Sequence, residues 1–128
     1  MVTQITKGIK ISVDTFFQGT CYNENKLKFA FKYIVTIENQ SSDVVQLNSR
    51  HWIILDSLNS DKIVNGEGVI GERPVLKPGK IYEYKSGCIL SSPYGAMYGH
   101  YRMINLNSTN KFNVIIPSFK LSAPFGLN

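Results

Sequence analysis

Alternation of apolar and polar residues along Leu27–Ile37 is the feature that most constrains the fold of this chain. The odd-numbered positions carry aliphatic or aromatic side chains, whereas the even-numbered positions include Lys28, Lys32 and Thr36. An amphipathic helix would place apolar residues every three or four positions, so a period of two predicts a strand with one buried face. The shorter run Ile9–Val13 alternates in the same way and predicts a second half-buried strand.

Further segments rich in branched and aromatic residues are separated by short polar turns that contain Asn, Asp, Gly, Ser or Pro. They are Val44–Leu55, Lys62–Asn65, Ile81–Leu90, Met97–Leu106 and Phe112–Leu121. No segment shows a helical stripe of apolar residues. About seven strands joined by short turns predict an all-β fold, namely an antiparallel β-sandwich of about seven or more strands.

Two of these segments carry information about sheet order. Trp52 and Ile54 stand on the opposite parity to the other apolar residues of Val44–Leu55, so this strand has apolar side chains on both faces. A strand of that kind is central in its sheet, or a loop covers its second face. Pro117 has no backbone N–H to donate, so Phe112–Leu121 should lie at a sheet edge or kink at this residue.

His51 and His100 are the two histidines of the chain. Their spacing matches no zinc or non-haem iron motif, and the pair supplies too few strong ligands, so we expect no metal site. His51 shares its strand parity with Leu47 and Ile53. This parity predicts a buried, hydrogen-bonded imidazole at position 51.

Length and charge limit the classes of partner. The 128 residues suffice for one domain, which we place at residues 1–128. The net charge of +5 and the isoelectric point of about 9.3 favour acidic partners in general. The lysines are dispersed along the chain, without a block of five or six like charges, which is typical of a solubilising surface. Nucleic acid is therefore not expected as the partner.

The sequence also indicates a cytoplasmic protein. The N-terminal segment lacks the apolar core of a secretory signal, and no stretch approaches the roughly 18–20 apolar residues that span a bilayer. Cys21 and Cys88 are the two cysteines. A domain of this size has enough core to fold without a disulfide, so we expect both to be free thiols.

The glycine-rich segment Gly66-x-Gly68-x-x-Gly71 matches a string that cradles pyrophosphate when it connects a strand to a helix. Here Pro74 follows and no helical pattern succeeds it, so dinucleotide binding of that kind is not expected. The ordinary interpretation is a loop that uses glycine for positive φ and close backbone approach. In the alternative interpretation, successive backbone N–H groups form an anion-binding nest, and Arg73 and Lys77 supply charge.

No catalytic constellation is recognisable. The chain has no GxSxG nucleophile elbow, and neither cysteine lies in an activating motif. We therefore expect no enzymatic activity, no catalytic residue and no cofactor.

Several separated blocks, in the same order, resemble the bacterial ApaG family along nearly all 128 residues. The blocks are Gln46–Asp56, Gly66–Pro74, Pro78–Gly87, Gly95–Met103 and Ile116–Leu121. The resemblance implies an immunoglobulin-like or fibronectin type III-like β-sandwich. It also points to protein recognition, because similar domains are appended to F-box proteins and to a polymerase-interacting protein. The family name is linked to cobalt and magnesium resistance or efflux. Arg73 and Lys80 depart from the usual family pattern and make the region beside the glycines more basic.

The leading hypothesis is a non-enzymatic binding module that presents a sheet face or an edge strand to a protein partner. The alternative is a protein that binds a small phosphate-containing ligand, such as pyrophosphate or a nucleotide, at Gly66, Gly68, Gly71 and Arg73. Direct binding of divalent cations is a third hypothesis with weak support from the residues.

Overall fold

The computed structural model describes residues 1–124, and within this range the chain forms nine β-strands. The strands are β1 Val2–Thr6, β2 Ile9–Asn23, β3 Lys26–Asn39, β4 Val45–Asp56, β5 Lys62–Glu67, β6 Val75–Leu76, β7 Ile81–Leu90, β8 Tyr94–Asn105 and β9 Lys111–Ser122. Sheet A has the order β1-β2-β3-β7, and sheet B has the order β5-β4-β8-β9, with the short β6 also paired to β4. All of these pairings are antiparallel.

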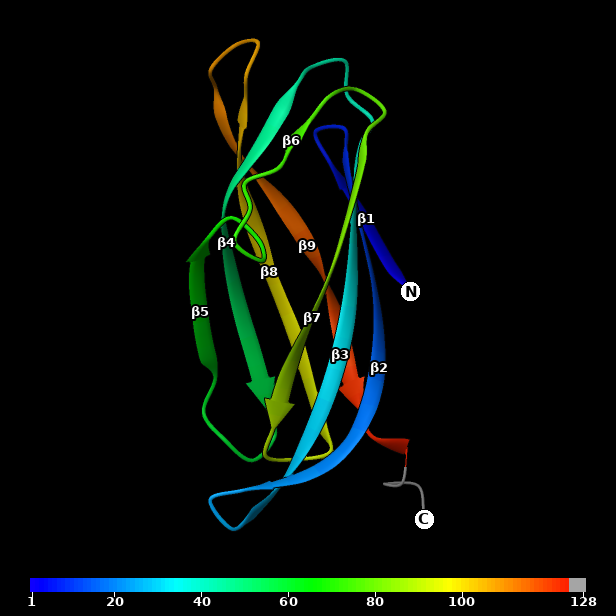
Figure 1. Ribbon diagram of the computed structural model, residues 1–128, viewed down its shortest axis with the longest axis vertical. Coiled ribbons are helices and arrows are strands. Elements are labelled where there is room, and N and C mark those ends of the chain that lie inside the picture. Colours follow the sequence, from blue (N-terminus) through cyan, green and yellow to red (C-terminus); the bar gives the residue numbers. More distant parts are fainter. Residues whose placement is uncertain (125–128) are drawn as a thin grey trace.

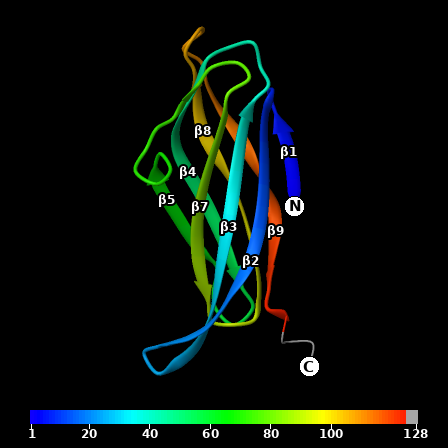
Figure 2. The same cartoon turned by 45° about the vertical axis from the view of Figure 1, so that its right-hand side comes forward.

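The two sheets pack face to face (Figure 1). Turned by 45°, the molecule shows β1 beside β9 along one long side (Figure 2). The other long side is bordered by β7 of sheet A and β5 of sheet B, the last strands of their sheets. This arrangement confirms the predicted all-β, immunoglobulin-like or fibronectin type III-like sandwich.

From Phe29 onward the alternation of β3 places its odd-numbered side chains in the interior, as predicted, whereas Leu27 at the start of the run is 42% exposed. Phe29, Phe31, Tyr33, Val35 and Ile37 are all buried. The core that they share with β2 and sheet B consists mainly of branched and aromatic residues, which suit a pleated surface with one buried face. The tyrosines of the core find partners inside it, because the hydroxyls of Tyr84 and Tyr101 hydrogen-bond to each other across the two sheets.

Both predictions about sheet order are confirmed. β4, which contains Trp52 and Ile54, lies between β5 and β8 and is central in sheet B. β9, which contains Pro117, is the edge strand of the same sheet. The β8–β9 register also shifts where Pro117 would pair, between the partner pairs Met97–Phe119 and Gly99–Ile116. Cys21 and Cys88 are free, also as predicted.

The predicted burial of His51 is wrong, because a β-bulge reverses the parity of β4. The register with β8 shifts between Leu47 and Ser49, so one extra residue lies between them. Leu47 is fully buried, and after the bulge the inward positions are even-numbered, as the burial of Trp52 shows. His51 therefore lies on the outer face of sheet B and is partly exposed. The hydrogen-bonded part of the prediction holds, since the imidazole Nδ1 contacts the side-chain oxygen of Asn65.

Some elements were not predicted. They are β1, β6 and the second half of β2, where the alternation weakens and most side chains are exposed or only partly buried. In residues 1–124, helices with the length and apolar character needed to cross a bilayer are absent.

Candidate functional site

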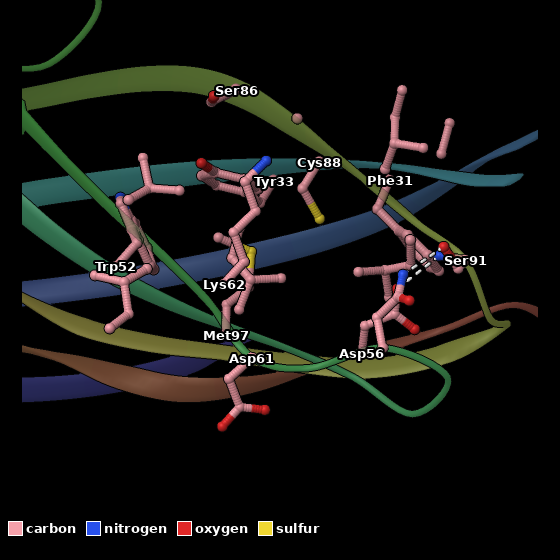
Figure 3. A pocket seen from close by; sticks show the side chains of 18 of the residues that line it. Phe31, Tyr33, Trp52, Asp56, Asp61, Lys62, Ser86, Cys88, Ser91 and Met97 are labelled. Carbon is pink, nitrogen blue, oxygen red and sulfur yellow. Dashed lines mark hydrogen bonds between the residues drawn. The ribbon is translucent and has the colours of Figure 1, made fainter. Parts of the chain in front are cut away.

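A cleft of about 1070 Å³ lies between the edge strands β5 and β7. Ligand-binding pockets in proteins typically measure roughly 300–1,000 Å³. Figure 3 shows the cleft from close by, with Phe31, Tyr33 and Cys88 contributed by sheet A and Trp52 by sheet B. We call this feature the β5–β7 cleft.

Small side chains on β7 open the cleft. The inward positions of β7 are even-numbered, and Tyr84 fills its position and is buried. The next inward positions carry Ser86 and Cys88, which are much smaller and line the cleft. The opposing strand β4 presents Trp52 at this level. The cleft therefore lies where the inward side chains of β7 are too short to fill the space between the two sheets.

The floor of the cleft is aromatic and tightly packed. The rings of Tyr33 and Trp52 lie 5.6 Å apart between centroids and are tilted by 56°. Phe119 contacts both rings from β9, at 5.8 Å from each, and meets Trp52 edge to face. Tilted and edge-to-face pairs are the favoured arrangements of aromatic side chains, so this floor is rigid.

The rim carries charges of both signs and exposed aliphatic residues. Lys28, Asp56, Asp61 and Lys62 border the cleft. Asp56 fastens one end of the cleft, because its carboxylate accepts hydrogen bonds from the amide of Ser91, at 2.7 Å, and from the hydroxyl of Ser92, at 2.9 Å. Burial alone raises the pKa of Asp56, but these hydrogen bonds and those from Leu58 and Asn59 outweigh it, so the pKa lies below its ordinary value.

The Cys88 thiol and the Tyr33 hydroxyl, which line the cleft, are neutral near pH 7. Burial raises the pKa of the Cys88 thiol to about 11, and the Asp56 carboxylate adds to this effect. Burial likewise raises the pKa of the Tyr33 hydroxyl. A thiol needs to ionise to act as a nucleophile, so Cys88 is suited to packing rather than to covalent chemistry. The lining of the cleft can bind a ligand that has both apolar and hydrogen-bonding groups, because it contains aromatic rings as well as hydroxyls.

The glycine-rich segment lies where β5 ends, and each glycine meets a structural requirement. A Cβ atom at Gly66 would lie 2.6 Å from the guanidinium carbon of Arg50, which crosses this position on the paired strand. At Gly68, which has a φ of 59°, a Cβ atom would lie 2.0 Å from the carbonyl oxygen of Glu72. Gly71 has a φ of 74° in the turn that follows Ile70. The ordinary interpretation of these glycines, positive φ and close approach, is confirmed for Gly68.

Backbone groups of this loop already have partners within the protein. The amide of Gly68 donates to Asn48, at 2.7 Å, and the amides of Val69 and Glu72 donate to each other's carbonyl oxygens, at 2.8 and 2.9 Å. Arg50 donates from Nη1 to the carbonyl oxygens of Glu67 and Gly68. These three amides are therefore not available to cradle an anion, and phosphate binding at this loop stays a prediction.

The structure brings Arg73 close to Gly68 but pairs it with an acid. Its guanidinium donates to the Glu67 carboxylate, and its Cγ would be 3.2 Å from a Cβ atom at Gly68. Both side chains of this ion pair are largely exposed, at 53% for Arg73 and 74% for Glu67. An exposed ion pair contributes little stability, so it holds the Arg73 side chain only weakly beside the loop.

Sequence reasoning missed the β5–β7 cleft, whose key residues are Tyr33, Trp52, Ser86 and Cys88. A signal was present in β7, where the inward row changes from tyrosines to Ser86 and Cys88. The smaller side chains of β7 indicate a gap only once it is known that this part of β7 faces Trp52 across the sandwich. Groups of three or more His, Cys, Asp or Glu side chains placed to hold a metal ion do not occur among residues 1–124.

The fold and the open cleft define an antiparallel β-sandwich with two free edge strands on one side. The family model of the ApaG domain matches residues 20–105. This chain belongs to the ApaG domain family, as its sequence blocks predict.

Curated relatives named protein ApaG match it along almost their whole length. The relative from Beijerinckia indica is 42% identical over 98% of this chain and 95% of its own. The relative from Shewanella halifaxensis is 39% identical over 96% of this chain and 97% of its own. These names state no reaction and no ligand.

Solved structures confirm the fold. A structural-genomics X-ray structure with 38% identity superimposes with a TM-score of 0.86, covering 91% of this chain and 88% of that one. A crystal structure named for the ApaA protein of Bordetella pertussis has 37% identity and a TM-score of 0.80, covering 91% and 94%.

Proposed function

We propose that this protein is a non-enzymatic binding module that holds an extended segment of a partner protein along β7, over the β5–β7 cleft. The observation that carries the proposal is the position of β7, which is the last strand of sheet A and borders the cleft from Ser86 to Leu90. An edge strand has a row of backbone N–H and C=O groups directed away from its sheet. An added strand can pair with that row.

The side chains around β7 suit such a segment. Ile89 on β7 and Ile63 on β5 flank the cleft and are exposed at 57% and 61%. An extended segment paired with β7 directs every second side chain toward the interior, where Cys88 and the aromatic floor offer an apolar environment. The other side chains would meet the charged rim. We therefore expect segments that alternate an aliphatic or aromatic residue with a polar one.

The states of Cys88, Tyr33 and Asp56 in the cleft favour binding over catalysis. Cys88 and Tyr33 are held in their neutral forms by burial. Asp56 is occupied by the Ser91 amide and the Ser92 hydroxyl, so its carboxylate stabilises the end of the cleft. A neutral thiol, a neutral phenol and a carboxylate that already accepts hydrogen bonds can hold a ligand without activating it.

Selection of linear peptides displayed on phage tests the proposal. Trp52 is the sole tryptophan and lies on the cleft floor, so its fluorescence reports binding there directly. Peptides that bind should change this emission and shift the amide NMR signals of β7. Two N-methylated versions of a peptide, one modified at odd-numbered and one at even-numbered residues, should differ in binding. Only the version whose methyl groups replace the amide hydrogens that face β7 should lose binding.

A substitution that fills the cleft supplies the matched comparison. Cys88→Phe places a ring in the gap and should abolish peptide binding, whereas Thr20→Phe adds the same ring at an exposed position of β2 outside the cleft. Selected peptides that bind Cys88→Phe as tightly as wild type, or whose NMR shifts avoid β7, would rule the proposal out.

A further inference from the structure

A second pocket, of about 490 Å³, lies on the outer face of sheet B. Strand pairing builds it, since His51 of β4 lies directly opposite Asn65 of β5 on one side and His100 of β8 on the other. In the next row Ser49 pairs with Arg102. Arg50 forms the wall between this pocket and the β5–β7 cleft, because it lines both.

The pocket gathers basic side chains. Its lining includes Arg50, Arg102 and both histidines of the protein, and its one acidic side chain is Glu67. The Glu67 carboxylate is paired with Arg73. The net electrostatic character of the pocket is therefore positive.

The two imidazoles stack directly on each other. Their ring centroids lie 5.0 Å apart with an angle of 24° between the planes. Like charges placed opposite each other on neighbouring strands destabilise a sheet. Burial lowers the pKa of His100, and the nearby His51 and Arg102 lower it further. A bound anion would remove this repulsion and favour protonation of the ring.

Several donors point to a ligand with more than one oxygen. The Arg102 guanidinium donates to Asn113 from Nη1, at 3.0 Å, and a guanidinium has five N–H donors in all. The His51 Nδ1 is engaged with Asn65, which leaves the Nε2 side of the ring as the other polar position. We propose that the His51, His100 and Arg102 side chains form a binding site for a phosphate group carried by a small soluble molecule.

This site differs from the predicted glycine loop in the groups that bind. It uses side chains of β4 and β8, whereas the loop amides of Gly68 and Val69 already donate to protein carbonyls. It is also independent of peptide binding on β7, so either proposal can fail alone.

Proton NMR of the two histidines during titration with inorganic phosphate and with pyrophosphate tests the site. Sodium chloride at matched ionic strength serves as the salt control, and His51→Asn assigns the signals. Both ring signals should shift in a saturable manner. Affinity should fall as the pH rises, although the ligand then carries more negative charge, because a bound anion favours the protonated His100 ring and this form is lost at higher pH.

Two arginine variants locate the site. Arg102→Gln should weaken phosphate binding by about tenfold or more, the effect of losing a charge-assisted hydrogen bond. Arg73→Gln removes the same charge beside the glycine loop and should change affinity less than Arg102→Gln does, because Arg73 does not line the pocket and acts on it only through its exposed partner Glu67. The thermal midpoint of each variant checks that the fold is retained.

Three outcomes would overturn the proposal. The first is the lack of a saturable shift of either histidine with phosphate or pyrophosphate in the tens of millimolar. The second is loss of binding in Arg73→Gln with full binding in Arg102→Gln, which would place the anion at the glycine loop. The third is binding confined to RNA or DNA oligonucleotides with steep salt dependence, which would indicate a polyanion surface.

Discussion

The two long sides of the sandwich are built from the same kind of strand and yet differ in whether they close. On the side of β1 and β9, the backbone amide of Ile115 donates to the Thr6 hydroxyl at 3.2 Å, and Lys7 lies over the ring of Phe112. On the other side, β5 and β7 border a cleft of about 1070 Å³. The edge strands of the two sides are similar in length and in antiparallel pairing. We therefore attribute the closing of one side and the opening of the other to their side chains.

Side-chain volume decides which side closes. Ile9, Ile11 and Val13 of β2 are buried and fill the interior toward β9. The corresponding inward row of β7 contains Ser86 and Cys88, which leave space in front of sheet B. A β-sandwich can thus keep one side for stability and open the other for binding without a change of topology.

Truncation on the closed side should have the largest effect. Ile11 is fully buried, so Ile11→Ala removes well-packed methylene and methyl groups and should lower the free energy of unfolding by about 2–5 kcal/mol. Ile5→Ala on β1, where the side chain is 55% exposed, should cost less than about 1 kcal/mol. Urea unfolding measures both. Equal costs would show that the closed side is not packed as described.

The boundary between the closed interior and the cleft is the Tyr84–Tyr101 pair. Burial raises the pKa of each hydroxyl, so both stay protonated and share one hydrogen bond. Tyr84→Phe leaves the Tyr101 hydroxyl buried without this partner and should destabilise the fold by about 1–3 kcal/mol.

The double variant Tyr84→Phe with Tyr101→Phe is the informative control. Because the double variant removes both partners, its loss in free energy of unfolding should be smaller than the sum of the losses in the two single variants. Strict additivity in urea unfolding would show that the two hydroxyls do not interact.

Much of the fold could be predicted because the period of two is a local property of the sequence. The alternation along Leu27–Ile37 specifies β3 and its buried face, and Pro117 correctly indicates an edge. The bulge in β4 could not be predicted, because it depends on a register with β8 that the sequence of β4 does not contain. That single extra residue moved His51 from the predicted core to the outer face.

The candidate sites were harder to predict because they depend on contacts between distant strands. The glycines of the segment Gly66–Gly71 were noticeable in the sequence, and two of them make room for the Arg50 side chain and the Glu72 carbonyl. Ser86 and Cys88 are ordinary residues in a strand, and their significance lies in what faces them. Pairing of His51 with His100 likewise follows from the β4–β8 register.

The pH dependence of stability should report on Asp56 at the end of the cleft. Its pKa is depressed in the folded protein, so its contribution is fully present above the ordinary value of about 3.8 and is lost as the pH falls through the lower folded value. Asp56→Asn should remove this part of the acid-induced loss in urea unfolding. Asp61→Asn removes a charge from the same rim and should leave the dependence of the free energy of unfolding on acidic pH as in wild type. If both variants weaken this dependence equally, the effect belongs to net charge and not to Asp56.

Truncation on the open side should have the smallest effect. Cys88 is partly exposed and lines the cleft, so Cys88→Ala enlarges a space already open to solvent and should cost less than about 1 kcal/mol. Val13→Ala on the closed side also shortens an inward side chain, but its site is 1% exposed, so a cavity forms and the cost should be larger. Urea unfolding of the two variants compares the sides directly. If Cys88→Ala proves as costly as Val13→Ala, the β5–β7 cleft is closed in solution, and a partner segment would need to open it.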